Sequence, residues 1–361
     1  MKIPFIDLQS QYQSYKSEID LAIQEVLDSS QYIMGPKVAE FEKNLSQFTG
    51  AKHAIGCSSG TDALLVALMA INIKPGDEII TSPFTFIASS EVVSFLGATP
   101  VFVDIEEDTY NIDASLIESK ITTKTKVIMP VSLYGQTADM DKINEIAKKH
   151  NLVVIEDAAQ SFGATYKGKR SCNLSDFGCT SFFPSKPLGC YGDGGALFTN
   201  DDELAEKARI ILAHGSKERY NHTVVGINGR LDAIQAAILN VKLSHFDKEI
   251  EKRAEIAQKY IDLLSDKQIR KPVVKTNRTS VYAQFTLQSS NREEIIEKLK
   301  KNDIPTAIHY PRSLHLQKCF EYLNYSKGDF PVSEKASKEV FSLPMSPFLN
   351  DDQIEYITSL I

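Results

Sequence analysis

The chain has 361 residues, of which 42% are hydrophobic, and a formal net charge of −7. This length exceeds that of a usual single domain, so we expect a large domain and a smaller one. The acidic balance argues against broad binding to nucleic acid. No apolar run approaches the roughly 18 residues of a membrane span, and the first residues do not resemble a signal peptide. We therefore expect a cytoplasmic protein that does not bind membranes.

The cysteines are few and scattered along the chain. There are five of them, with no CxxC pair and no histidine at a ligand spacing, at positions 57, 172, 179, 190 and 319. An odd number without such spacing favours neither a disulfide framework nor a zinc site. We expect no metal.

Short apolar runs that predict buried strands alternate with helical patterns through the first two thirds of the chain. The predicted strands are 78–81, 100–103, 126–131, 152–156, 179–183 and 196–199. The predicted helices are 24–29, 38–48, 138–150 and 201–212, the last with Asp201 as its N-cap. This alternation predicts an α/β fold with a large, mostly parallel sheet sandwiched by helices.

A long amphipathic helix is predicted from 231 to 264, after which the pattern changes. The remainder predicts strands at 280–288 and 307–310 and helices at 292–302 and 351–360. We place a domain boundary near residue 243. This gives a large domain at 1–242 and a smaller C-terminal α+β domain at 243–361, on which the N-terminal helix is a candidate to pack.

Lys186 is the most informative residue of the sequence. It lies in the segment SFFPSKPLG (181–189), shortly before the glycine-rich run at 192–195, and Asp157 ends an apolar strand pattern earlier in the chain. Pyridoxal phosphate (PLP) needs an acid beside its pyridinium nitrogen and a lysine for its Schiff base. A single loop lysine is usually just a solvated charge, but this pairing favours a PLP site.

Four shorter patterns fit the same cofactor, and three of them have a plainer alternative. Gly60 and Thr61 begin an apolar helix and would offer N–H groups and a hydroxyl to an anion, unless the segment is a simple serine N-cap. Ser181 is a second phosphate donor. Phe86 could stack on the pyridine ring or belong to the core, and Gln160 could donate to the phenolic oxygen of PLP or face solvent.

A basic, polar loop from 214 to 222, followed by GINGR at 226–230, stands out in an acidic chain. It could receive a diphosphate or a carboxylate, or it could be a solvated charged loop. His309 and Tyr310 form a similar but weaker pattern in the C-terminal part.

Taken together, these motifs resemble the sugar-nucleotide aminotransferases of the DegT/DnrJ/EryC1/StrS family over nearly the whole chain. The segments that carry the resemblance are SGTDAL (59–64), VSLYG (131–135), EDAAQ (156–160), 181–195, GIN (226–228) and HYP (309–311). The resemblance implies the aspartate aminotransferase-like fold type I, PLP as cofactor, and a homodimer whose active sites are shared between subunits.

The resemblance also implies a role for each residue. Lys186 would form the Schiff base, Asp157 would pair with the pyridinium, Gln160 would contact the phenolic oxygen and Phe86 would stack on the ring. The phosphate would be held by Gly60, Thr61, Ser181 and, from the neighbouring subunit, Asn228. The candidates for the nucleotide-sugar side are Arg219, Arg230, His309 and Tyr310.

Within the family, the segments 163–172 and 183–193 are most similar to enzymes that aminate C3 of UDP-linked 3-keto-2-acetamido sugars, with L-glutamate as donor. That group includes a glucuronate type for O-antigen and a glucose type for lipid A. We favour the neutral glucose acceptor, because no carboxylate clamp is evident in the sequence.

Three alternatives remain. The acceptor could be a dTDP-linked 3-keto sugar or a 4-keto sugar nucleotide. A dehydratase on the same fold would have histidine in place of Lys186, and a non-catalytic PLP-binding regulator would not need both Lys186 and Asp157.

Overall fold

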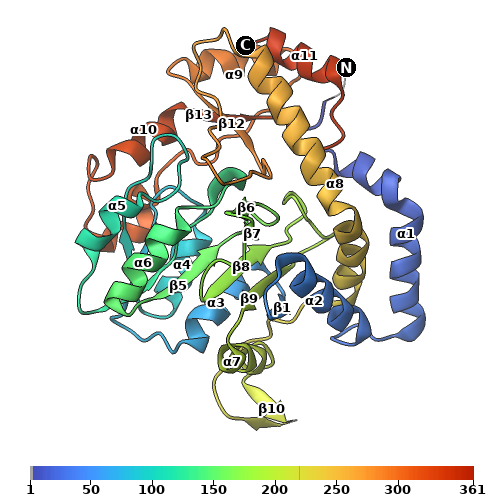
Figure 1. Cartoon of the computed structure of the whole chain (residues 1–361), viewed down its shortest axis with the longest axis vertical. Coiled ribbons are helices and arrows are strands. Elements are labelled where there is room, and N and C mark those ends of the chain that lie inside the picture. Colours follow the sequence, from blue (N-terminus) through green and yellow to red (C-terminus); the bar gives the residue numbers. More distant parts are fainter. Residues whose placement is uncertain (1–2, 219) are drawn as a thin grey trace.

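A seven-stranded sheet forms the centre of the computed structural model, which describes residues 3–218 and 220–361 (Figure 1). The strand order is β1-β9-β8-β5-β4-β2-β3. Neighbouring strands are parallel except around β9, which is antiparallel to both β1 and β8. The strands are β1 (His53–Cys57), β2 (Glu78–Thr81), β3 (Thr99–Phe102), β4 (Thr125–Ile128), β5 (Val153–Asp157), β8 (Phe177–Ser181) and β9 (Gly195–Thr199). The predicted fold class is confirmed.

Helices cover both faces of the sheet, so both faces are buried. Successive strand residues point to opposite faces and therefore belong to different cores. Ile155 of β5 packs into one core and the preceding Val154 into another. The first face is covered by α3 (Gly60–Ala70), α4 (Ala88–Phe95) and α7 (Asp202–Leu212). The second is covered by α2 (Pro36–Thr49), α5 (Ala114–Ile117), α6 (Met140–His150) and α8 (Ala233–Leu263). Strand β1 was not predicted, because its sequence HAIGC has a single β-branched residue.

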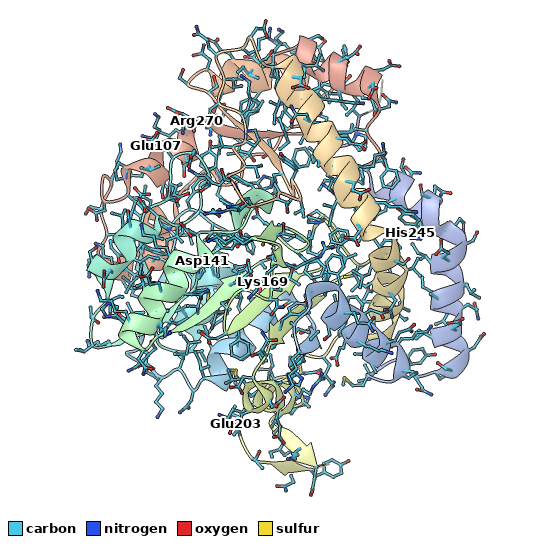
Figure 2. All side chains as sticks on the ribbon, in the orientation of Figure 1. Glu107, Asp141, Lys169, Glu203, His245 and Arg270 are labelled. Carbon is cyan, nitrogen blue, oxygen red and sulfur yellow. The ribbon has the colours of Figure 1, made fainter. Side chains whose placement is uncertain are left out.

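The predicted long helix is confirmed as α8, and α1 (Leu8–Ser29) lies against it (Figure 1). Gln11 of α1 donates to both carboxylate oxygens of Glu249, at 3.0 and 2.9 Å. His245, labelled on α8 in Figure 2, stacks on Tyr15 of α1 with ring centroids 4.1 Å apart. Helix α1 therefore packs along α8, while Ile3 before it joins the C-terminal core described next.

The core around α8 changes along its length. Phe246 packs with the large sheet, whereas Ile256 and Tyr260 belong to a second cluster, which we call the C-terminal core. That core is built from β12 (Phe285–Gln288), β13 (Val340–Leu343), α9 (Arg292–Lys301) and α11 (Asp351–Ser359). Arg270 connects the two regions by donating to the carbonyl of Glu107 at 2.6 Å (Figure 2). The boundary near residue 243 stays a prediction, because α8 passes through it as one continuous helix.

The predicted strand at 307–310 is wrong. Only Ala307 pairs, in an isolated bridge with Ser342, on the edge of β13 opposite to β12. The chain then leaves this edge, because His309 and Tyr310 line the cavity described below while Ile308 packs into the neighbouring core.

The remaining elements are short. They are β6 (Thr165–Tyr166), β7 (Lys169–Arg170), the β10–β11 hairpin (Ser216–Glu218 and Asn221–His222), α10 (Pro331–Glu339) and the 3₁₀ helices η1 (Glu118–Lys120), η2 (Leu133–Gly135), η3 (Leu314–Leu316) and η4 (Lys318–Leu323). Within residues 3–218 and 220–361, no helix is long and apolar enough to cross a membrane. The same residues contain no group of three or more His, Cys, Asp or Glu side chains arranged to hold a metal ion.

Candidate active site

A cavity of about 490 Å³ opens at the carboxyl edge of the sheet. Parallel strands bring the residues that follow them to one edge, which is where open α/β sheets bind ligands. Because β9 runs antiparallel, the loop between β8 and β9 leaves and re-enters the sheet at this edge. The predicted residues that line the cavity are Gly60, Thr61, Phe86, Asp157, Gln160, Ser181, Lys186, His309 and Tyr310.

Lys186 and Asp157 both line the cavity, and their charges interact. Burial lowers the pKa of the Lys186 ammonium, and the charge of Asp157 opposes that shift only in part. Burial likewise raises the pKa of the Asp157 carboxyl, which hydrogen bonds and Lys186 oppose. A lysine with a lowered pKa holds more of its amine in the nucleophilic, neutral form. The site therefore favours attack of Lys186 on a carbonyl group.

Asp157 is held in one orientation by two donors. The hydroxyl of Ser89 donates to Oδ2 at 2.7 Å, and the backbone N–H of Ala159 donates to Oδ1 at 3.1 Å. Ser89 is fully buried on α4. Sequence reasoning missed Ser89, because no residue pattern distinguishes it from the adjacent Ser90 on the same helix.

An anion cradle lies where α3 begins. Ser59 is the N-cap, accepting from the backbone N–H of Asp62 at 3.0 Å, so the plain N-cap interpretation is also correct. The N–H groups of Gly60 and Thr61 precede the first intrahelical bonds and are available to a ligand. A Cβ on Gly60 would lie 2.6 Å from Cβ of Ser181, so only glycine lets the start of the helix and Ser181 approach this closely.

Gln160 connects the cavity to the C-terminal part. Its Oε1 accepts from the backbone N–H of Tyr134 at 2.8 Å, and its Nε2 donates to the hydroxyl of Tyr310 at 3.0 Å. Gln160 is buried, so the solvent-facing alternative is wrong. Phe86 is 55% exposed at the cavity, so the core alternative is also wrong for this ring.

His309 and Gln284 line the same cavity from the C-terminal part. Burial and the charge of Lys186 lower the pKa of His309, which favours a neutral imidazole at neutral pH. Gln284 was not predicted as a site residue, and its Oε1 is buried without a hydrogen-bond partner in the described structure. Gln284 falls within the strand predicted at 280–288, and no motif marks it as a site residue.

The remaining predicted residues lie apart from the cavity lining. Asn228 is exposed and its backbone bridges Ala213. Arg230 is partly buried, and its backbone bridges Cys57, immediately before the anion cradle. Its Nε is buried without a hydrogen-bond partner in the described structure. Arg219 lies outside the described residues.

Comparison with known protein families identifies the family to which the chain belongs. The model of the DegT/DnrJ/EryC1/StrS aminotransferase family matches residues 13–361. The chain is a member of this family. It is 53% identical to UDP-2-acetamido-2-deoxy-3-oxo-D-glucuronate aminotransferase of Pseudomonas aeruginosa, over 99% of both chains. It is also 47% identical to a protein of Geobacillus stearothermophilus named pleiotropic regulatory protein, over 100% of this chain and 98% of that one.

Two solved structures of similar proteins extend the family assignment. DesV of S. venezuelae has a TM-score of 0.98 and 40% identity, covering 99% of this chain and 97% of that one. NtdA of Bacillus subtilis, with its cofactor PMP bound, has a TM-score of 0.92 and 32% identity, covering 99% and 84%. The DegT/DnrJ/EryC1/StrS aminotransferase fold is therefore present from end to end.

Replacing Ser89 with alanine should weaken catalysis on the acid side of the pH profile. The Ser89 hydrogen bond opposes the burial that raises the pKa of Asp157, so its loss raises that pKa further. Asp157 should then lose its charge at a higher pH, and kcat/KM should fall roughly ten- to hundredfold, as expected for a lost hydrogen bond to a charged group. The measurement is kcat/KM against pH.

The matched control is Ser90→Ala, because Ser90 is equally buried on α4 but its hydroxyl has no hydrogen-bond partner in the described structure. Its pH profile should coincide with that of the unsubstituted protein. If both variants gave the same pH profile, the proposed effect of Ser89 on Asp157 would be rejected.

Proposed function

We propose that the protein transfers the amino group of L-glutamate to C3 of a UDP-linked 2-acetamido-3-oxo sugar, with PLP as cofactor. The observation that carries this proposal is the pairing of Lys186 with Asp157 across the cavity, in a chain of this aminotransferase family. Family membership alone supports the reaction class. The sugar and the nucleotide rest on the relatives, as argued below.

The residues of the cavity fit PLP group by group. The unpaired N–H groups of Gly60 and Thr61, with the Ser181 hydroxyl beside them, match a phosphate. Lys186 and Asp157 match the aldehyde and the pyridinium nitrogen. Phe86 lies exposed on the cavity wall, where a flat ring can stack on it. NtdA, which shares this fold, is described with PMP, the amine form of the same cofactor.

Two side chains, Asp157 and Lys186, would act together with the cofactor in this reaction. Bound PLP supplies an electron sink that stabilises negative charge on the substrate carbon. Asp157, fixed by Ser89, keeps the pyridine nitrogen protonated. Lys186, which lines the cavity, would be the base that removes the proton from the α-carbon of glutamate. The same lysine would move the proton in the sugar half of the reaction. Because the amino group is transferred in two half-reactions, the kinetics should be ping-pong.

Lys186→Ala should abolish covalent attachment of PLP. The unsubstituted protein should absorb at roughly 400 to 430 nm, the range of lysine-bound PLP, and the variant should not. Borohydride reduction followed by peptide mass spectrometry locates the attachment. Recovery of a reduced PLP adduct from the alanine variant at the unsubstituted yield would reject Lys186 as the attachment site.

The acceptor we propose is the glucuronate form of the sugar. The relative from Pseudomonas aeruginosa, named for that substrate, is 53% identical, whereas the enzyme of Acidithiobacillus ferrooxidans named for the neutral glucosamine form is 41% identical. This comparison favours the uronate over the neutral sugar that the sequence alone favoured. The cationic candidates for the extra carboxylate are Arg219 and Arg230. Because Arg230 lies apart from the cavity lining of its own chain, it would act across the dimer interface proposed below.

We expect kcat/KM with L-glutamate to be at least about tenfold higher for the UDP-linked 3-keto glucuronate than for the neutral 3-keto sugar, as loss of one charged contact implies. The assay compares these two acceptors with dTDP-linked 3-keto and 4-keto sugars, by mass spectrometry of the amino product. Preference for the neutral sugar would restore the sequence-based choice. Turnover of 4-keto sugars alone would reject amination at C3.

We also propose that the protein is a homodimer with shared active sites. Phe86 and Phe183 are 55% and 51% exposed at the cavity, which leaves its mouth incomplete in one chain. The hairpin β10–β11 projects from the molecule below α7 (Figure 1), and Val224 and Val225 just after it are exposed. Closed twofold dimers are the commonest way to bury such surfaces. Asn228, which lies just beyond them, would reach the phosphate of the neighbouring subunit.

Complementation tests the shared sites. Lys186→Ala and Asn228→Ala should each be inactive, or nearly so, as homodimers, and mixing them should restore up to about one quarter of the normal activity, because a heterodimer carries one site with both residues intact. Subunit exchange is verified by native mass spectrometry. Absence of recovery in fully exchanged mixtures would contradict sharing through Asn228.

A regulatory role is the second candidate function, because one relative of 47% identity is named as a regulatory protein. The acceptor assay separates the two: a regulator would bind PLP but would not convert any sugar with glutamate. Retention of both Lys186 and Asp157 supports the enzyme.

We propose the cytoplasm as the site of action, because all five cysteines are free thiols, which suits a reducing compartment.

A further inference from the structure

The loop that carries Lys186 contains no regular secondary structure between β8 and β9. Backbone hydrogen bonds hold part of it: Lys186 N–H donates to the carbonyl of Phe183 at 2.8 Å, and Cys190 N–H donates to that of Phe182 at 2.8 Å. Gly189 lies so close to Pro184 that a Cβ would be 2.5 Å from its carbonyl oxygen. These contacts join the segment around Lys186 to residues 189 and 190, so contacts that fix residues 189–191 from outside the loop also act on the position of Lys186.

Helix α8 provides those external contacts from one face. The side-chain amide of Gln235 binds the backbone of Tyr191: its Oε1 accepts from the Tyr191 N–H at 2.8 Å, and its Nε2 donates to the Tyr191 carbonyl at 3.3 Å. Seven residues further along, Lys242 donates from Nζ to the carbonyl of Gly189. Residues seven apart lie on the same side of a helix, two turns from each other. The two side chains thus hold the loop at 189 and 191, shortly after Lys186.

Lys242 is an unusual residue for this position, because its side chain is only 2% exposed. It forms no ion pair with any acidic group in the described structure. The charged or titratable groups that act on it are Glu249 and Arg253 on α8 and Cys190 on the loop, and the Tyr191 ring centroid lies 5.2 Å from Nζ. Burial lowers the pKa of Lys242 to about 8. Burying a charged group costs free energy unless hydrogen bonds or an opposite charge compensate for its lost hydration.

We propose that Lys242 is a positioning residue for the reaction: by donating to the carbonyl of Gly189, together with Gln235 at Tyr191, it holds the Lys186 loop in the conformation that attaches PLP. This inference rests on the proposed function. Methionine at position 242 would fill the same space and remove the donor. A purely structural lysine could be replaced in this way with little effect on the folded protein, or even with a gain in stability.

The experiment compares Lys242→Met with the unsubstituted protein, each prepared without cofactor and then titrated with PLP. We expect PLP binding to weaken about tenfold to hundredfold, as the loss of a hydrogen bond from a charged donor implies. The rates of the glutamate and sugar half-reactions should fall by the same factor, because Lys186 serves both. The pH at which the Lys186-attached band titrates should also shift. The melting temperature without cofactor should change by only a few degrees.

Lys248→Met is the matched control, because Lys248 is exposed on the same helix; it should bind PLP as the unsubstituted protein does. Gln235→Met keeps the buried charge and removes the contacts to Tyr191, so it should weaken PLP binding as well, and it decides the question if Lys242→Met does not fold. Unchanged PLP affinity, band and rates in the folded variants would overturn the inference. If the unsubstituted protein itself gave no reduced adduct at Lys186, the proposed function would fail instead.

Discussion

The candidate site depends on the electrostatic interaction between two buried groups, Lys186 and Asp157. Lys186 and Asp157 lie on neighbouring parts of the sheet edge, and burial shifts the pKa of each toward its neutral form. Neither group would be stable there alone, because an unpaired buried charge is strongly unfavourable. The sheet, the cap of α3 and the loop after β8 together provide the geometry that keeps the two groups facing each other. A ligand with a cationic ring nitrogen and a carbonyl satisfies both.

Helix α8 joins the regions that this arrangement requires. Its first half packs on the large sheet and its second half on the C-terminal core. Its polar residues are also spaced along one side: Gln235 and Lys242 contact the Lys186 loop, and Glu249 accepts from Gln11 and Tyr15 of α1. One helix therefore aligns the N-terminal helix, the lysine loop and the C-terminal residues that reach the cavity.

Much of this could be predicted from the sequence, because the strands, the long helix and the residues at strand ends follow short local patterns. Lys186, Asp157, Gly60 and Thr61 all line one cavity, as their motifs indicated. The supporting residues could not be predicted in the same way. Ser89 lies 68 positions from Asp157 in sequence, and its role depends on packing between α4 and β5. The prediction for 307–310 failed for a similar reason, since after Ala307 the packing of His309 and Tyr310 at the cavity overrides the local strand pattern.

The hydrogen bond between Gln160 and Tyr310 has a consequence for redesign of the acceptor pocket. Tyr310 stands on the C-terminal side of the cavity, yet its hydroxyl is the acceptor for Gln160, which in turn holds the backbone of Tyr134. A library that varies Tyr310 to admit a different sugar would also release Gln160. With Tyr310 on the sugar side and Gln160 on the cofactor side, as we propose, selectivity for the sugar and affinity for the cofactor would be coupled. Successful variants should be selected as paired changes at both positions rather than as single substitutions.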